Sequence, residues 1–89
     1  MTHDLNHAHT FCTSNRNSLS SDTLCGCFFC ITIFEPKEIE QWLDMEHTAI
    51  CPHCGIDSII GKYSGFPITE EFLRQMQEVW FNTLSTDQI

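Results

Sequence analysis

Two pairs of cysteines, each with two residues between its members, most constrain what this chain can fold into. Cys27 and Cys30 form the first pair, Cys51 and Cys54 form the second, and 20 residues separate the pairs. This spacing is typical of a four-thiolate metal site. A turn with two intervening residues aims both sulfurs at one ion, and two such turns complete a tetrahedron with Zn–S distances of about 2.3 Å. The sequence therefore predicts one Zn²⁺ per chain, bound by these four cysteines.

Other interpretations of the cysteines stay open at this stage. Cys25 and Cys30 are an alternative first pair, but Cys27 matches the second pair better, so we place Cys25 beside the site as a spare thiol. Iron is the alternative to zinc, because sites with four thiolates accept both metals. Six cysteines would also allow three disulfides in a secreted protein, but the first residues show no export signal.

Catalytic uses of the same residues fit the sequence less well. A thiol–disulfide oxidoreductase needs its first cysteine at a helix N-terminus, whereas Gly55 and a β-like segment follow the second pair here. A zinc deaminase carries an H-x-E motif, which this chain lacks, and four thiolates leave no open position for a water. Asp57 and Ser58 have no general base placed by a motif, so we assign them to turn and strand-cap roles. We therefore expect a non-enzymatic protein.

The charge of the chain narrows the class of its partners. Its 89 residues carry a net charge of −8, with only four lysines and arginines in total. Nucleic acids and anionic membrane surfaces attract cationic proteins, so we expect neither as a partner. No stretch approaches the roughly 18 apolar residues of a membrane span. We expect a small cytoplasmic domain, in a compartment where thiols stay reduced, that contacts another protein.

Strands are expected beside both cysteine pairs. The aromatic and β-branched residues of 24–34 favour strands that flank the first pair. Residues 48–50 lead as a short strand into the second pair, and residues 56–61 favour a further strand. Each cysteine pair then forms a metal knuckle carried on short antiparallel strands.

Two helices are expected to cover these strands. Pro36 favours a helix over residues 36–45, because its missing N–H costs nothing in a first turn. Thr69 is a good N-cap for a helix that runs to about residue 83. Apolar residues recur at helical spacing in both segments. The residues expected to pack on the strands are Trp42, Leu43, Phe72, Met76, Val79 and Trp80.

The ends of the chain are expected to lie outside the folded domain. Residues 1–14 are polar and carry three histidines, which predicts a solvated tail, with a second metal site at His7, His9 and Cys12 as the alternative. Residues 15–84 would then form a single zinc-binding domain, and residues 85–89 a C-terminal tail. The predicted class is α+β: a small zinc-ribbon-like (rubredoxin-like) domain with two metal knuckles on short antiparallel strands and two packed helices.

Three segments carry a resemblance to known proteins: CGCFFC at 25–30, FEPKEIEQWL at 34–43 and TAICPHCGIDS at 48–58. Through them the chain resembles small, uncharacterised bacterial proteins described only as cytoplasmic proteins, which carry zinc-ribbon-like cysteine pairs. The likeness covers about residues 15–82 and implies a cytosolic metal-binding protein, without implying an activity. Residues 51–55 are also similar to the second knuckle of rubredoxin, which implies electron transfer by iron, but Ile31 stands where rubredoxins carry glycine.

Overall fold

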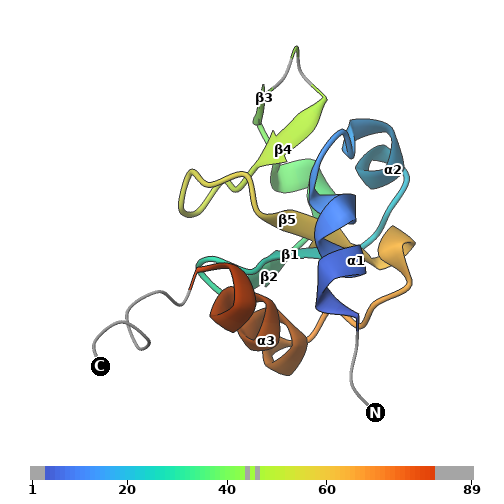
Figure 1. Cartoon of the computed structure of the whole chain (residues 1–89). Helices are drawn as coiled ribbons and strands as arrows, with labels where there is room; N and C mark the ends of the chain where they lie inside the picture. Colours follow the sequence, from blue (N-terminus) through green and yellow to red (C-terminus); the bar gives the residue numbers. More distant parts are fainter. Residues whose placement is uncertain (1–3, 44, 46, 82–89) are drawn as a thin grey trace.

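Strand β1 (Cys25–Cys27) is the middle strand of a three-stranded antiparallel sheet in the computed structural model of the chain, which describes residues 4–43, 45 and 47–81. It pairs with β2 (Thr32–Phe34) on one side and with β5 (Ile59–Gly61) on the other. Strands β3 (Gln41–Leu43) and β4 (Thr48–Ile50) form a separate antiparallel hairpin, which projects from the rest of the molecule (Figure 1). The expected α+β class with antiparallel strands beside both cysteine pairs is confirmed.

Helix α3 (Glu70–Trp80) is the longest helix that the structure describes, and it begins where the sequence predicts. Thr69 caps it, because its Oγ1 accepts a hydrogen bond of 3.2 Å from the N–H of Phe72. Three residues of one face are buried, as expected for an amphipathic helix: Phe72, Leu73 and Met76. Val79 and Trp80 were expected in the core, but they are 51% and 36% exposed.

The helix predicted over residues 36–45 is wrong. Pro36–Glu38 form a single 3-10 turn, η2, and the extended angles of Ile39 (φ −75°, ψ 125°) end it. Residues 41–43 form β3 instead, and Leu43 is 44% exposed. The reason is tertiary: β4 needs a partner for its backbone N–H and C=O groups, and β3 supplies it, whereas an isolated helix of about ten residues is marginal in water.

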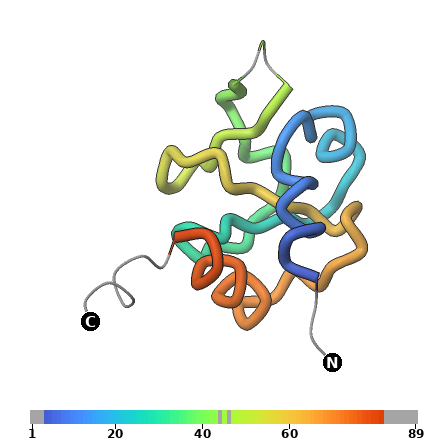
Figure 2. The backbone as a smooth tube through the Cα atoms, in the orientation of Figure 1, coloured from blue at the N-terminus to red at the C-terminus, as the bar shows by residue number. Residues whose placement is uncertain are grey.

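The solvated tail predicted over residues 1–14 is also wrong for the part that the structure describes. Residues 5–9 form helix α1 (Leu5–His9), followed by the 3-10 turn η1 (Thr10–Cys12). Asp4 caps α1 by accepting a hydrogen bond of 3.0 Å from the N–H of His7. Ala8 and Cys12 are buried, and α1 packs against α3 (Figure 2). Residues 1–3 and the expected tail at 85–89 lie outside the described residues.

The buried residues form two clusters, which β1 separates. Gly26 faces α3, and a Cβ atom at this position would lie only 2.8 Å from Leu73 Cδ1, so glycine lets the helix rest directly on the strand. The cluster on this face, called the helix-side core here, comprises Ala8, Cys12, Phe28, Ile60, Ile68, Phe72, Leu73 and Met76. The cluster on the other face, the cysteine-side core, comprises Leu19, Cys25, Cys27, Phe34, Ile39, Ala49, Cys51 and Ile59.

The side chain of Asn15 links the N-terminal segment to both sheets by hydrogen bonds. It precedes the short helix α2 (Arg16–Ser20) and is only 2% exposed. Its Nδ2 donates to the carbonyl of Ile59 in β5 at 3.0 Å, and its Oδ1 accepts from the N–H of Ala49 in β4 at 3.0 Å. Because both groups of the amide are used inside the protein, the side chain holds β4 and β5 in a fixed relation.

Among the described residues, no helix has the length and apolar character needed to cross a membrane.

Candidate metal centre

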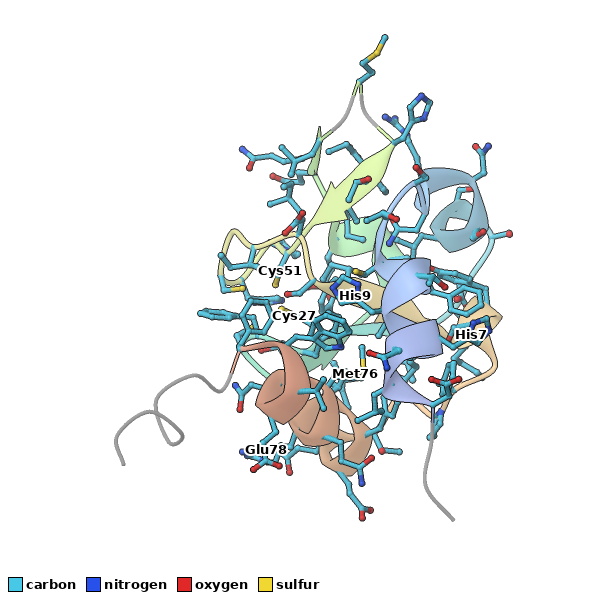
Figure 3. All side chains as sticks on the ribbon, in the orientation of Figure 1. His7, His9, Cys27, Cys51, Met76 and Glu78 are labelled. Carbon is cyan, nitrogen blue, oxygen red and sulfur yellow. The ribbon has the colours of Figure 1, made fainter. Side chains whose placement is uncertain are left out.

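The four cysteines predicted as ligands come together between the two sheets. Cys27 ends β1 and Cys30 lies in the turn to β2, while Cys51 and Cys54 follow β4. Their four sulfur atoms all lie within 4.8 Å of one another. Figure 3 labels Cys27 and Cys51, whose side chains approach each other from the two sheets. The cluster predicted from the spacing of the cysteine pairs is therefore present in the structure.

The distances between the sulfurs fit a single ion better than they fit disulfides. Cys27 Sγ lies 3.6 Å from Cys54 Sγ, and Cys30 Sγ lies 3.8 Å from Cys51 Sγ. A tetrahedron with Zn–S bonds of about 2.3 Å has sulfur–sulfur edges of about 3.8 Å. A disulfide bond is about 2.05 Å long, and all six cysteines of the chain are free thiols. The four residues thus suit a tetrahedral metal ion, and zinc and iron both accept this arrangement.

The two knuckles have the same backbone. In each, the residue two positions after the first cysteine donates its N–H to that cysteine's Sγ, at 3.3 Å in both knuckles. The residue after the second cysteine donates its N–H to the carbonyl of the first, at 2.9 Å in both. That residue is Ile31 in one knuckle and Gly55 in the other, and both have a left-handed backbone, with φ of 57° and 81°. Both turns therefore point a backbone dipole at a sulfur, which stabilises negative charge there.

Two hydroxyl groups also contact the sulfurs. Ser58 Oγ lies 3.1 Å from Cys27 Sγ, and Thr32 Oγ1 lies 3.2 Å from Cys30 Sγ. Ser58 is buried, and its carbonyl accepts a hydrogen bond from Phe28, which holds it beside the first knuckle. Neither contact was predicted from the sequence, which suggested only a turn or strand-cap role for Ser58. The sequence indicates these contacts only weakly, because all it shows is that Thr32 and Ser58, which carry hydroxyl groups, follow a cysteine pair within a few residues.

The burial and close spacing of the four sulfurs favour a bound cation over four free thiolates. Burial raises the pKa of Cys51 to about 11, and burial likewise raises the pKa of Cys54. At Cys30 burial acts in the same direction, but its hydrogen bonds with Thr32 and with the neighbouring thiols together outweigh burial and lower the pKa. Four thiolates at this separation repel one another, and a bound divalent ion would be the largest local charge that compensates them. The site is therefore suited to a metal that displaces the thiol protons.

Cys25 lies outside this group, in agreement with its placement as a spare thiol. Its Sγ donates to the carbonyl of Phe34 at 3.5 Å, and burial raises its pKa to about 12. It therefore stays a neutral thiol in the cysteine-side core.

The alternative second site does not form. Among the residues that the structure describes, the four-cysteine group is the sole metal-ligand cluster, so His7, His9 and Cys12 make none. The rings of the two histidines instead contact aromatic side chains: His7 meets Phe11 edge-on with centroids 5.1 Å apart, and His9 lies over Trp80 at 3.9 Å. The histidines that suggested a metal-binding tail thus take part in packing.

Comparisons with known proteins identify no relative. No family model, no curated protein and no solved structure matches the chain. The resemblances to small bacterial zinc-ribbon-like proteins and to rubredoxin accordingly stay predictions. Any function proposed for the chain therefore depends on the geometry of its four cysteines.

Proposed function

We propose that the chain is a non-enzymatic zinc-binding protein, in which one Zn²⁺ fixes a scaffold for contact with another protein. Its ligands are Cys27, Cys30, Cys51 and Cys54. The observation that carries the proposal is the approach of these four sulfurs to within 4.8 Å of one another. Four protein thiolates complete the coordination of zinc, whereas catalytic zinc sites keep one position for water or substrate. A structural ion is therefore the role that this donor set favours.

The position of the cluster supports a structural role. Cys27 lies in the three-stranded sheet and Cys30 in its β1–β2 turn, while Cys51 and Cys54 follow the hairpin, so one ion would join the two sheets. Each strand is only three residues long, and such short strands are weakly stable alone. In small domains of this kind, the free energy of metal binding becomes free energy of folding.

The charge of the protein supports a basic partner. The chain has a net charge of −8, and four thiolates with one Zn²⁺ add about −2 more. The outer face of α3 contributes to this charge through exposed glutamates, and Arg74 is the one lysine or arginine within Glu70–Trp80. An acidic surface steers a basic partner by complementary potential, and the association weakens with salt.

Elemental analysis of the natively purified protein, with an absorption spectrum of the same sample, tests the metal. One zinc per chain and no visible band is the expected result. Stoichiometric iron with thiolate charge-transfer bands would replace the scaffold by an electron carrier, and absence of any bound metal would contradict both functions. Cys51→Ser should lose the metal and Cys25→Ser should keep it, so the second variant is the matched control.

A further inference from the structure

We propose that the cluster is also a site of reversible oxidation by hydroperoxides, which joins cysteines across the two knuckles. The disulfides expected are Cys27 with Cys54 and Cys30 with Cys51. This inference rests on the proposed metal site and adds a covalent modification to it. The usual expectation for a C-x-x-C pair is a disulfide within the pair, so the predicted connectivity is specific to this structure.

Each of the two close sulfur–sulfur contacts joins one knuckle to the other, and each pairs a buried cysteine with a partly exposed one. Cys27 and Cys51 are 0% and 2% exposed, whereas Cys30 and Cys54 are partly exposed. The contact of 3.6 Å joins buried Cys27 to accessible Cys54. The contact of 3.8 Å joins buried Cys51 to accessible Cys30. Each partly exposed cysteine therefore lies beside a buried one, an arrangement that suits an attacking thiol with a resolving thiol next to it.

The first chemical step takes place at an accessible sulfur. The thiolate of Cys30 or Cys54 attacks one oxygen of hydrogen peroxide, the S–O bond forms and the O–O bond breaks. The sulfur is oxidised by two electrons to a sulfenic acid, and the leaving hydroxide takes a proton to become water.

In the second step the covered partner resolves the sulfenic acid. Its thiolate attacks the oxidised sulfur, the S–S bond forms, and the S–O bond breaks with loss of hydroxide, which a proton converts to water. Two peroxides and four protons thus convert four thiolates to two disulfides and four waters. All the ligands are consumed, so Zn²⁺ is released unchanged in oxidation state.

The two connectivities have different structural consequences. Disulfides across the knuckles keep the segment after β1 joined to the segment after β4, which is the link that the metal provides. Disulfides within each knuckle would leave the two segments unconnected. Cys12 and Cys25 lie outside the group and are buried, so they are expected to remain thiols.

Treatment of the zinc-loaded protein with hydrogen peroxide tests the connectivity. The expected result is release of one zinc per two peroxides consumed, measured with a chromogenic zinc chelator, and a fall in free thiols from six to two per chain. Peptide mapping by mass spectrometry should find the two cross-knuckle disulfides, and dithiothreitol should restore zinc binding. Disulfides mainly within the pairs, or thiols intact at peroxide levels that oxidise free cysteine, would overturn the proposal.

Trapping of the intermediate tests the order of attack. Dimedone, which labels sulfenic acids, should mark Cys30 and Cys54 and leave Cys27 and Cys51 unmarked. A Cys12→Ala, Cys25→Ser double variant serves as the control and should give the same labels and zinc release. Dimedone on the covered cysteines, or loss of oxidation in the control, would contradict the assignment.

The metal site and its oxidation by peroxide are tested separately by these measurements. A purified protein without metal would contradict the proposed function, and disulfide mapping of that metal-free protein would still decide the connectivity. A protein with one zinc that peroxide does not release would leave the metal site standing and remove the oxidation alone.

Discussion

Ile31 and Gly55 hold the same place in the two knuckles, and both have a left-handed backbone, with φ of 57° and 81°. A β-branched residue rarely adopts this conformation, so the first knuckle imposes backbone angles that its sequence disfavours. The side chain of Ile31 packs against the helix-side core, which offsets part of that cost. At Gly55 a Cβ atom would meet nothing within 4 Å, so the backbone angle alone decides the effect of a substitution.

Gly55→Ala is therefore expected to lower the free energy of unfolding of the zinc-loaded protein by about 1–2 kcal/mol, the cost of a left-handed alanine. Gly55→Asn is the matched control and should lose less than half as much, because asparagine tolerates these angles. Urea unfolding with zinc present measures both. Equal losses in the two variants would assign the effect to the added side chain rather than to φ.

Ser58→Ala removes the hydroxyl that contacts Cys27 Sγ at 3.1 Å, and it leaves the carbonyl of Ser58 in place. We expect the zinc affinity to fall by about 10-fold or more, the usual effect of losing a partner of a metal ligand. Competition with a chelator of known affinity measures the change. Ser20→Ala is the control, because the exposed Ser20 hydroxyl donates to the carbonyl of Asn17 within α2, and an equal loss there would contradict a specific role.

Asn15→Ala is expected to destabilise the protein by about 3 kcal/mol. It would leave the buried carbonyl of Ile59 and the N–H of Ala49 without their partner, and each unsatisfied group costs about 1–3 kcal/mol. Thermal or urea unfolding gives the value. Asn17→Ala, at an exposed position of the same segment, should change stability by less than about 0.5 kcal/mol. A loss at Asn15 no larger than that would show that water replaces its hydrogen bonds.

Stability is expected to fall at alkaline pH, partly because of Cys12. Its ordinary pKa is 9.0, and burial raises the pKa to about 11 in the folded protein. Because the folded state keeps the proton to higher pH, this stabilising contribution is complete below pH 9 and is lost as the pH rises to 11. Cys12→Ala should remove up to about 2 kcal/mol of the decline between these limits. Parallel urea titrations of both proteins at several pH values would reveal it, and identical slopes would refute it.

The four-cysteine cluster was predictable because the spacing of the cysteines constrains the chain more strongly than any local preference. Nothing else was needed to identify Cys27, Cys30, Cys51 and Cys54. The helix α3 was predictable for a similar reason: a threonine cap and a periodic apolar face act over one continuous segment. Features that depend on distant partners were not predictable in this way, and the contact of Ser58 with Cys27 is an example.

The predicted helix over residues 36–45 and the predicted tail over residues 1–14 were wrong because the structure of both segments depends on tertiary contacts. Ile39, Trp42 and Leu43 have helical spacing, yet residues 41–43 pair with β4, and only Ile39 of the three is buried. In the N-terminal segment the histidines suggested a polar tail and concealed the spacing of Leu5, Ala8 and Cys12 at intervals of three and four, which is that of a helix with one buried face. The polar composition of that segment was a weaker guide than its apolar positions.

The division of the interior by β1 has a consequence for the cooperativity of folding. All four sulfurs belong to or pack against the cysteine-side core, whereas α1 and α3 cover the helix-side core. Loss of an ion bound at the four cysteines would therefore act on one half of the molecule, and the other half would keep its own apolar contacts. The metal-free chain should not unfold as one unit: its helix-side half should melt as a separate transition at a higher temperature than its cysteine-side half, with β1 and β5 as the boundary.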